Sequence, residues 1–133
     1  MLLDQILDDI PVEYRDRYEA LHARAGVELD ALRPQLDDYL VTLGQVAAVA
    51  RGMDFSVAER LANALLNLID AMTAGDERQR RAVHAAVIYF VQEDDDEEIT
   101  GVLGFDDDVQ VVNAVARAIG RPDLIVALPR TEG

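Results

Sequence analysis

Apolar residues recur at spacings of three and four along almost the whole chain, and this period is the main constraint on its fold. The pattern is clearest at Val57, Leu61, Leu65, Leu68 and Met72. Such spacing places the side chains on one face of an α-helix. Strand signals, such as Thr/Val alternation or an Asn-Gly turn, are nearly absent. The sequence therefore predicts an all-α protein.

Helix-ending and helix-starting residues divide this pattern into five or six helices. Proline or glycine stands where a helix is expected to stop or turn, at Pro11, Gly26, Gly52, Gly75 and Gly120. Ser56 and Glu59 form a capping box, and Asp76 and Asp106 are further N-terminal caps. The expected helices cover residues 2–10, 12–25, 34–51, 57–74, 77–92 and 106–119, with a helical turn at 27–32 and a docked apolar tail at 122–128.

The chain is long enough for one domain of ordinary size. A domain of 133 residues buries roughly 65–70% of the surface that its unfolded chain exposes. Half of the residues are apolar, which is too many for an intrinsically disordered protein. The sequence contains no linker of the kind that separates domains. We expect residues 1–133 to form one compact bundle with an acidic loop between two of its helices.

The net charge of −14 comes from 26 acidic residues and 12 basic residues, all of which are arginine. This surplus disfavours binding to nucleic-acid phosphates and to anionic membrane surfaces. The longest apolar run, residues 85–91, is far shorter than the ~20 residues of a membrane helix. The first residues, MLLDQILDDIP, have no basic start of the kind that a secretory signal has. We expect a cytoplasmic protein.

Nine of the acidic residues, and no basic residue, lie between positions 93 and 108. Those at 106–108 open a helix, where carboxylates are stabilised by the helix dipole. Those at 93–98 follow a helix C-terminus, where the dipole opposes them. A solvated loop is one interpretation. The other is a face for a basic partner protein, formed by Glu93, Asp94, Asp95, Asp96, Glu97, Glu98 and Asp108.

The same carboxylates offer an alternative function, because Ca²⁺ and Mg²⁺ take several oxygen ligands. A calcium-loop frame that starts at Asp96 places Thr100 at position five, Gly101 at position six and Asp107 at position twelve. The match is partial, since position twelve is usually glutamate. A divalent cation is the one cofactor that this sequence suggests. Its candidate ligands are Asp94, Asp96, Glu98, Asp106 and Asp107.

Residues 85–120 carry a recognisable order of short motifs. Tyr89-Phe90-Val91 ends a helix, an acidic loop follows, and Leu103-Gly104-Phe105 precedes the pair Asp107-Asp108. This order resembles the YkvA-like family of small bacterial helical domains of unknown function. The loop here has no proline, unlike the loop of that family. The resemblance implies an all-α fold and supplies no established activity.

Catalytic motifs are scarce. The chain has no Cys, its one serine is Ser56, and His22 and His84 lie on different helices. His84 is expected to be partly buried, and His22 to lie at the surface. The polar stripe of Arg60, Asn63, Asn67 and Asp70 is expected to be the outward face of a helix. Metal-assisted hydrolysis through the 94–108 carboxylates is the remaining enzymatic alternative. We favour a non-enzymatic, cytoplasmic helical domain that binds a basic partner protein through an acidic face.

Overall fold

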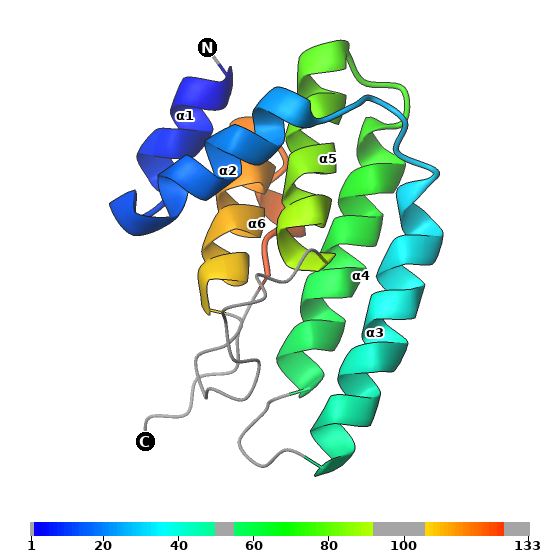
Figure 1. The fold of residues 1–133 in the computed structure, drawn as a ribbon. Coiled ribbons are helices and arrows are strands. Elements are labelled where there is room, and N and C mark those ends of the chain that lie inside the picture. Colours follow the sequence, from blue (N-terminus) through cyan, green and yellow to red (C-terminus); the bar gives the residue numbers. More distant parts are fainter. Residues whose placement is uncertain (1, 50–54, 92–105, 127–133) are drawn as a thin grey trace.

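The structure is a computed structural model that describes residues 2–49, 55–91 and 106–126, without the side chains of residues 46, 47, 49, 106 and 107. The described residues form six α-helices, a short 3-10 helix η1 and no strand (Figure 1). The all-α prediction is confirmed. The elements are α1 (Leu2–Asp9), α2 (Val12–Arg24), α3 (Leu32–Val49), α4 (Phe55–Met72), α5 (Glu77–Val91), α6 (Asp106–Ala118) and η1 (Pro122–Leu124).

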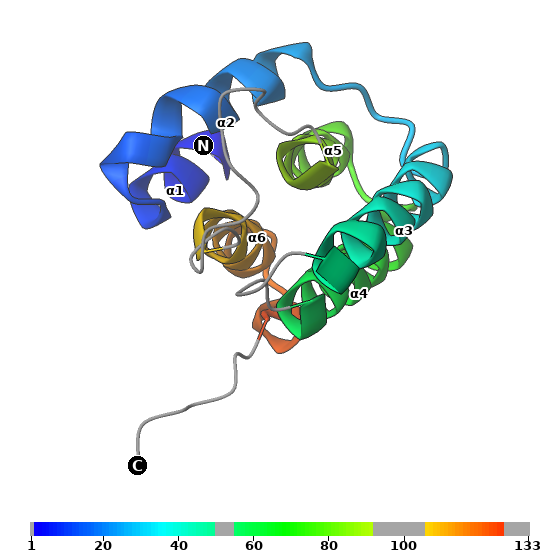
Figure 2. The ribbon, with the colours of Figure 1, turned by 60° about the horizontal axis from the view of Figure 1, so that its bottom comes forward.

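Helix α5 lies in the middle of the bundle. It contacts each of the other five α-helices, whereas α3 and α4 lie side by side as a pair and α1 rests on α6 (Figure 2). Buried residues cover α5 on several sides, as expected for a helix that is surrounded by others. They are Ala82, Val83, Ala85, Ala86, Val87, Tyr89 and Phe90. One hydrophobic cluster joins buried residues of all six helices.

The N-terminal helices are joined by a tight turn at Pro11. The proline precedes the first residue of α2 with φ −52° and ψ 144°, as an extended residue before a helix. The Nε of Arg15 donates to the carbonyl oxygen of Ile10 at 2.9 Å, which holds the turn. In α2 the buried side chain is Tyr18, and its hydroxyl donates to the carbonyl oxygen of Ala82 in α5 at 2.9 Å. This hydrogen bond and the ring anchor α2 across α5.

Asp76 caps α5, as predicted, and forms a capping box with Gln79 that the prediction did not include. The backbone N–H of Gln79 donates to Oδ1 of Asp76 at 2.8 Å. The backbone N–H of Asp76 donates in return to Oε1 of Gln79 at 3.1 Å. These two bonds satisfy N–H groups that a helix start otherwise leaves without a partner.

Helix α6 ends in a Schellman motif at Gly120, which was predicted as its stop. The N–H of Arg121 donates to the carbonyl of Ala116 at 2.8 Å, and that of Gly120 to the carbonyl of Arg117 at 3.1 Å. Gly120 has φ +83°, a backbone conformation that residues other than glycine rarely adopt. Beyond it, the buried Val126 exchanges two hydrogen bonds with the side chain of Asn113. The apolar tail is therefore docked, as far as residue 126.

Several expected helix ends lie one or two residues from the observed ones, and three further differences concern an expected helical turn and two helix starts. Residues 27–31 are not helical, because this segment passes between α2 and α3 with Leu29 buried in the core. Helix α3 starts at Leu32, before Pro34, which falls in the first turn where its missing N–H is not needed. Helix α4 starts at Phe55, so Ser56 lies inside its first turn. Local sequence signals define helix ends only to within a residue or two.

The outward face of α4 is confirmed, since all four residues of the polar stripe predicted on this helix are exposed. Among the described residues, no helix combines the length and the apolar character that crossing a bilayer requires.

The same substitution at two glycines should have opposite effects on stability. Ala at position 120 keeps open space around its Cβ but must adopt φ +83°, so Gly120→Ala should lower the free energy of unfolding by about 1–2 kcal/mol. Gly44 lies inside α3, where a Cβ would meet the Phe55 ring at an ordinary 3.6 Å. Gly44→Ala should therefore raise this free energy by about 0.5–1 kcal/mol. Urea denaturation measures the free energy of unfolding of both variants. A change of the same sign in the two variants would contradict the expected difference between the glycines.

Candidate functional site

Most of the residues predicted to form a site lie outside the described part of the chain. This holds for Glu93, Asp94, Asp95, Asp96, Glu97 and Glu98, and for the side chains of Asp106 and Asp107. Asp106 and Asp107 are the first two residues of α6. Within the described residues, no group of three or more His, Asp or Glu side chains is placed to hold a metal ion. The divalent-cation site stays a prediction.

Asp108 is the one predicted site residue whose side chain the structure describes. It is 8% exposed, on the buried side of the first turn of α6. A carboxylate in this position is stabilised by the N–H groups of the helix start. Its side chain therefore offers little surface to a partner.

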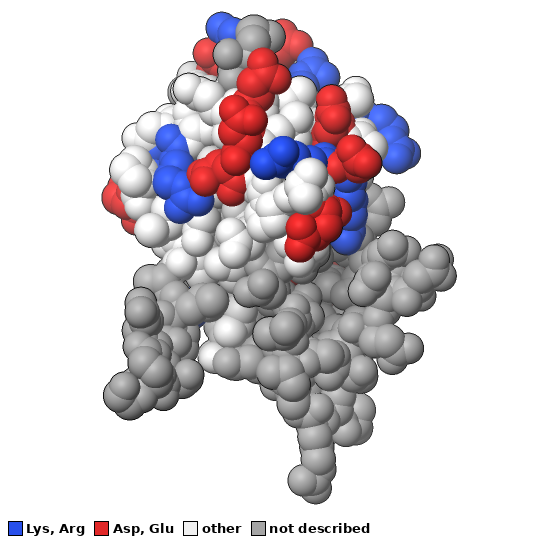
Figure 3. Space-filling view, turned by 90° about the vertical axis from the view of Figure 1, so that its left-hand side faces the viewer, with Lys and Arg blue, Asp and Glu red and all other residues white. Residues whose placement is uncertain are grey.

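The structure brings together a different set of acidic side chains, on α1 and α2. We call this set the N-terminal acidic surface; its members are all exposed, and they are Asp4, Asp8, Asp9, Glu13, Asp16 and Glu19. Figure 3 looks at the side of the molecule on which these two helices lie, and shows acidic side chains across its described part with arginine side chains between them. The sequence showed that the acids of residues 2–10 avoid the apolar face. It held no sign that α1 and α2 would be in contact.

Two arginines of α2 are turned toward the body of the protein. The guanidinium of Arg17 lies 4.3 Å from the centre of the Tyr89 ring, and its Nη2 donates to the Tyr89 carbonyl at 3.2 Å. Arg15 donates to the carbonyl of Ile10, as described above. Both side chains are half-buried, whereas the carboxylates around them are exposed. The third arginine of α2, Arg24, is exposed at the end of the helix, so α1 and α2 present six exposed carboxylates and one exposed guanidinium to a partner.

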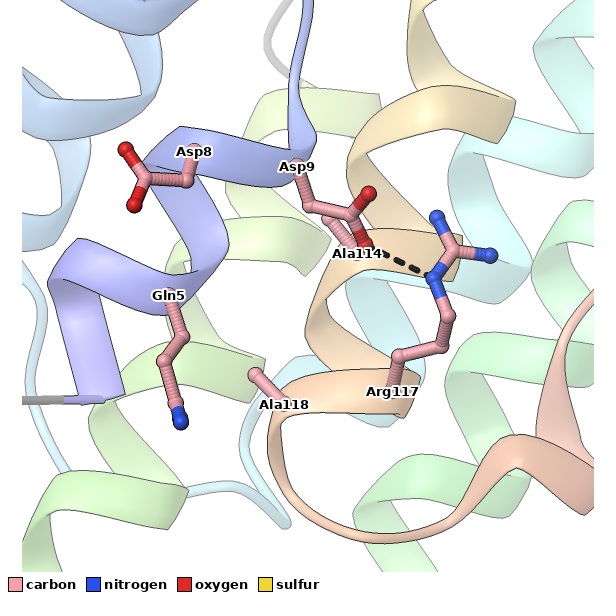
Figure 4. Close-up of a pocket in the computed structure, with 6 residues that line it drawn as sticks. All are labelled: Gln5, Asp8, Asp9, Ala114, Arg117 and Ala118. Atoms are coloured by element: carbon pink, nitrogen blue, oxygen red, sulfur yellow. Dashed lines mark hydrogen bonds and ion pairs between the residues drawn. The ribbon is translucent and has the colours of Figure 1, made fainter.

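A groove runs between α1 and α6 beside the acidic surface (Figure 4). It has a volume of about 430 Å³ and is lined by Gln5, Asp8, Asp9, Ala114, Arg117 and Ala118. The Nε of Arg117 donates to Oδ2 of Asp9 at 2.7 Å across it. Because Asp9 and Arg117 are 41% and 43% exposed, this ion pair contributes only about 0–1 kcal/mol to stability.

The two histidines lie on α2 and α5, and both are close enough to Arg81 to be affected by its charge. The guanidinium of Arg81 donates to the carbonyl of Ala25 at 3.0 Å and to Oε2 of Glu77 at 2.7 Å. Partial burial, and then the charge of Arg81, lower the pKa of both His22 and His84. His84 is partly buried, as predicted, whereas His22 is half-buried rather than at the surface. The sequence placed them on separate helices and did not indicate that they would share a neighbour.

Comparison with protein-family models, with characterised proteins and with solved structures found no match. The resemblance of residues 85–120 to the YkvA-like family stays a prediction.

The histidine pair should make stability depend on pH. A histidine whose pKa is lower in the folded state binds its proton more readily when the chain unfolds. The neutral form of each histidine is therefore compatible with the folded state above pH 6.5, the pKa of an unperturbed histidine. The folded state loses stability as the pH falls through 6.5 toward the lower pKa of the folded protein. The free energy of unfolding, measured by urea denaturation, should therefore decrease from pH 7.5 to pH 5.5. This decrease should be larger for the natural protein than for the double variant His22→Gln/His84→Gln. An unchanged difference between the two pH values in this variant would contradict the expectation.

Proposed function

We propose that this protein is a non-enzymatic, cytoplasmic interaction domain that binds a basic partner protein through its N-terminal acidic surface. The observation that carries the proposal is the set of six exposed carboxylates on two adjoining helices. Two arginines of the same helices are turned inward, toward Ile10 and Tyr89. The acidic run at 93–98 adds to the negative charge of the whole chain.

The electrostatic properties of such a surface favour a protein partner with a positive patch. Opposite charges on two surfaces raise the rate of encounter and select among partners. Exposed charges are screened over about 8 Å at physiological ionic strength, so only nearby carboxylates add to one binding patch. The six side chains lie on helices of 8 and 13 residues that contact each other, so carboxylates that are neighbours on these helices add to one patch.

Binding of a defined basic probe tests the proposal. The probe is a fluorescent peptide of alternating arginine and alanine. The matched control peptide has uncharged citrulline in place of each arginine. Fluorescence anisotropy at 50, 150 and 300 mM NaCl measures the affinity. We expect the arginine peptide to bind at low salt and to lose about tenfold or more in affinity as salt rises, because screening weakens exposed charges. Equal binding of the citrulline peptide would overturn the proposal.

Two variants of equal charge locate the binding surface. The first neutralises Asp4, Glu13, Asp16 and Glu19 as Asn or Gln, and the control neutralises the exposed Glu28, Asp37, Asp38 and Glu59 in the same way. Both lose four negative charges, so a general effect of net charge affects them equally. We expect the first variant to bind the arginine peptide about tenfold more weakly than the control. Equal affinities would show that α1 and α2 do not form the binding surface.

A further inference from the structure

The groove between α1 and α6 already holds a guanidinium group. Arg117 of α6 extends toward α1 and donates from its Nε to Asp9 at 2.7 Å (Figure 4). The small side chains of Ala114 and Ala118 line the groove beside it. The geometry of the groove is therefore suited to an arginine side chain between two helices.

The groove has room and charge beyond what Arg117 uses. Its volume of about 430 Å³ falls in the range of about 300–1,000 Å³ that is typical of ligand clefts. Asp8 and the amide of Gln5 also line it, and both residues are exposed to solvent. The Asp9 carboxylate faces Arg117 and is an acceptor that matches the fork of donors on a guanidinium, whereas the Asp8 carboxylate points away from Arg117 and adds negative charge at the rim (Figure 4).

The ion pair that now spans the groove is easily given up. Its two side chains are 41% and 43% exposed, so water solvates either of them when they separate. Arg117 is one of the last residues of α6, and its long side chain can turn outward to solvent without moving the helix.

We propose that the groove between α1 and α6 receives an arginine side chain of the basic partner, which displaces Arg117 from Asp9. The proposal rests on the proposed function and names the contact that gives it specificity. Arg117 then acts as an internal competitor, which keeps the groove occupied when no partner is bound. Arginine is required because a guanidinium presents several donors in one plane, whereas an ammonium is a point charge.

A cycle of single and double variants tests the displacement with the arginine peptide. Arg117→Gln removes the competitor and should tighten binding about threefold or more beyond Arg24→Gln, an exposed arginine at the end of α2 that carries the same charge change. Asp9→Asn should weaken binding about fivefold. In the Asp9→Asn background, Arg117→Gln should have no more effect than Arg24→Gln. Equal effects of Arg117→Gln and Arg24→Gln in the natural background would overturn the proposal.

A variant without a charge change provides an independent test. Ala118→Leu fills the groove with a larger side chain and should weaken binding of the arginine peptide about fivefold, with thermal melting to confirm that the protein remains folded. A folded Ala118→Leu protein with natural affinity would overturn the proposal. If the peptide binds and depends on Asp4, Glu13, Asp16 and Glu19 but not on Asp9, Arg117 or Ala118, the groove proposal fails and the proposed function stands. If the natural protein does not bind the peptide at low salt, both fail.

Discussion

The burial of α5 is the constraint on which the other contacts depend. This helix contacts α1, α2, α3, α4 and α6, so its side chains must pack in several directions at once. Small side chains on α5 let the backbones of neighbouring helices approach closely; they are Ala82, Ala85 and Ala86. Where the neighbours need a specific anchor, a larger group provides it, as Tyr18 of α2 does by donating to the Ala82 carbonyl. A change of volume on α5 is therefore felt by several helices together.

The sequence predicted the parts of this fold that depend on local chemistry. The N-terminal cap at Asp76 and the glycine end at Gly120 are formed within a few residues, so their signals can be read directly. The non-helical segment around Leu29 could not be predicted in the same way, because Leu29 is buried in the core among residues that are distant in the sequence. The acidic surface of α1 and α2 was missed for the same reason. Acids on two short helices become one surface only when Pro11 turns the chain and the helices pack.

The candidate site illustrates how far charge alone leads. The sequence indicated the acidic residues at 93–98 and 106–108, but not which way a helical carboxylate points. Asp108 opens α6 as predicted and is nevertheless buried, since the third residue of that helix falls on the side that faces the core. The nearby pairing of Asp9 with Arg117 joins residues 108 positions apart, and no local pattern contains it.

The arginines explain why so much negative charge remains available at the surface. Arg17 packs on Tyr89, Arg15 binds the turn at Ile10, and Arg81 joins α5 to the end of α2. A guanidinium can do this because its planar donors reach carbonyl oxygens and aromatic rings while it keeps its charge. These three arginines thus serve packing, while many acidic side chains of the described residues stay in water. The exposed pair of Arg117 and Asp9 differs from them, since it adds little to packing and can be exchanged for a partner's arginine without loss of the buried contacts around α5.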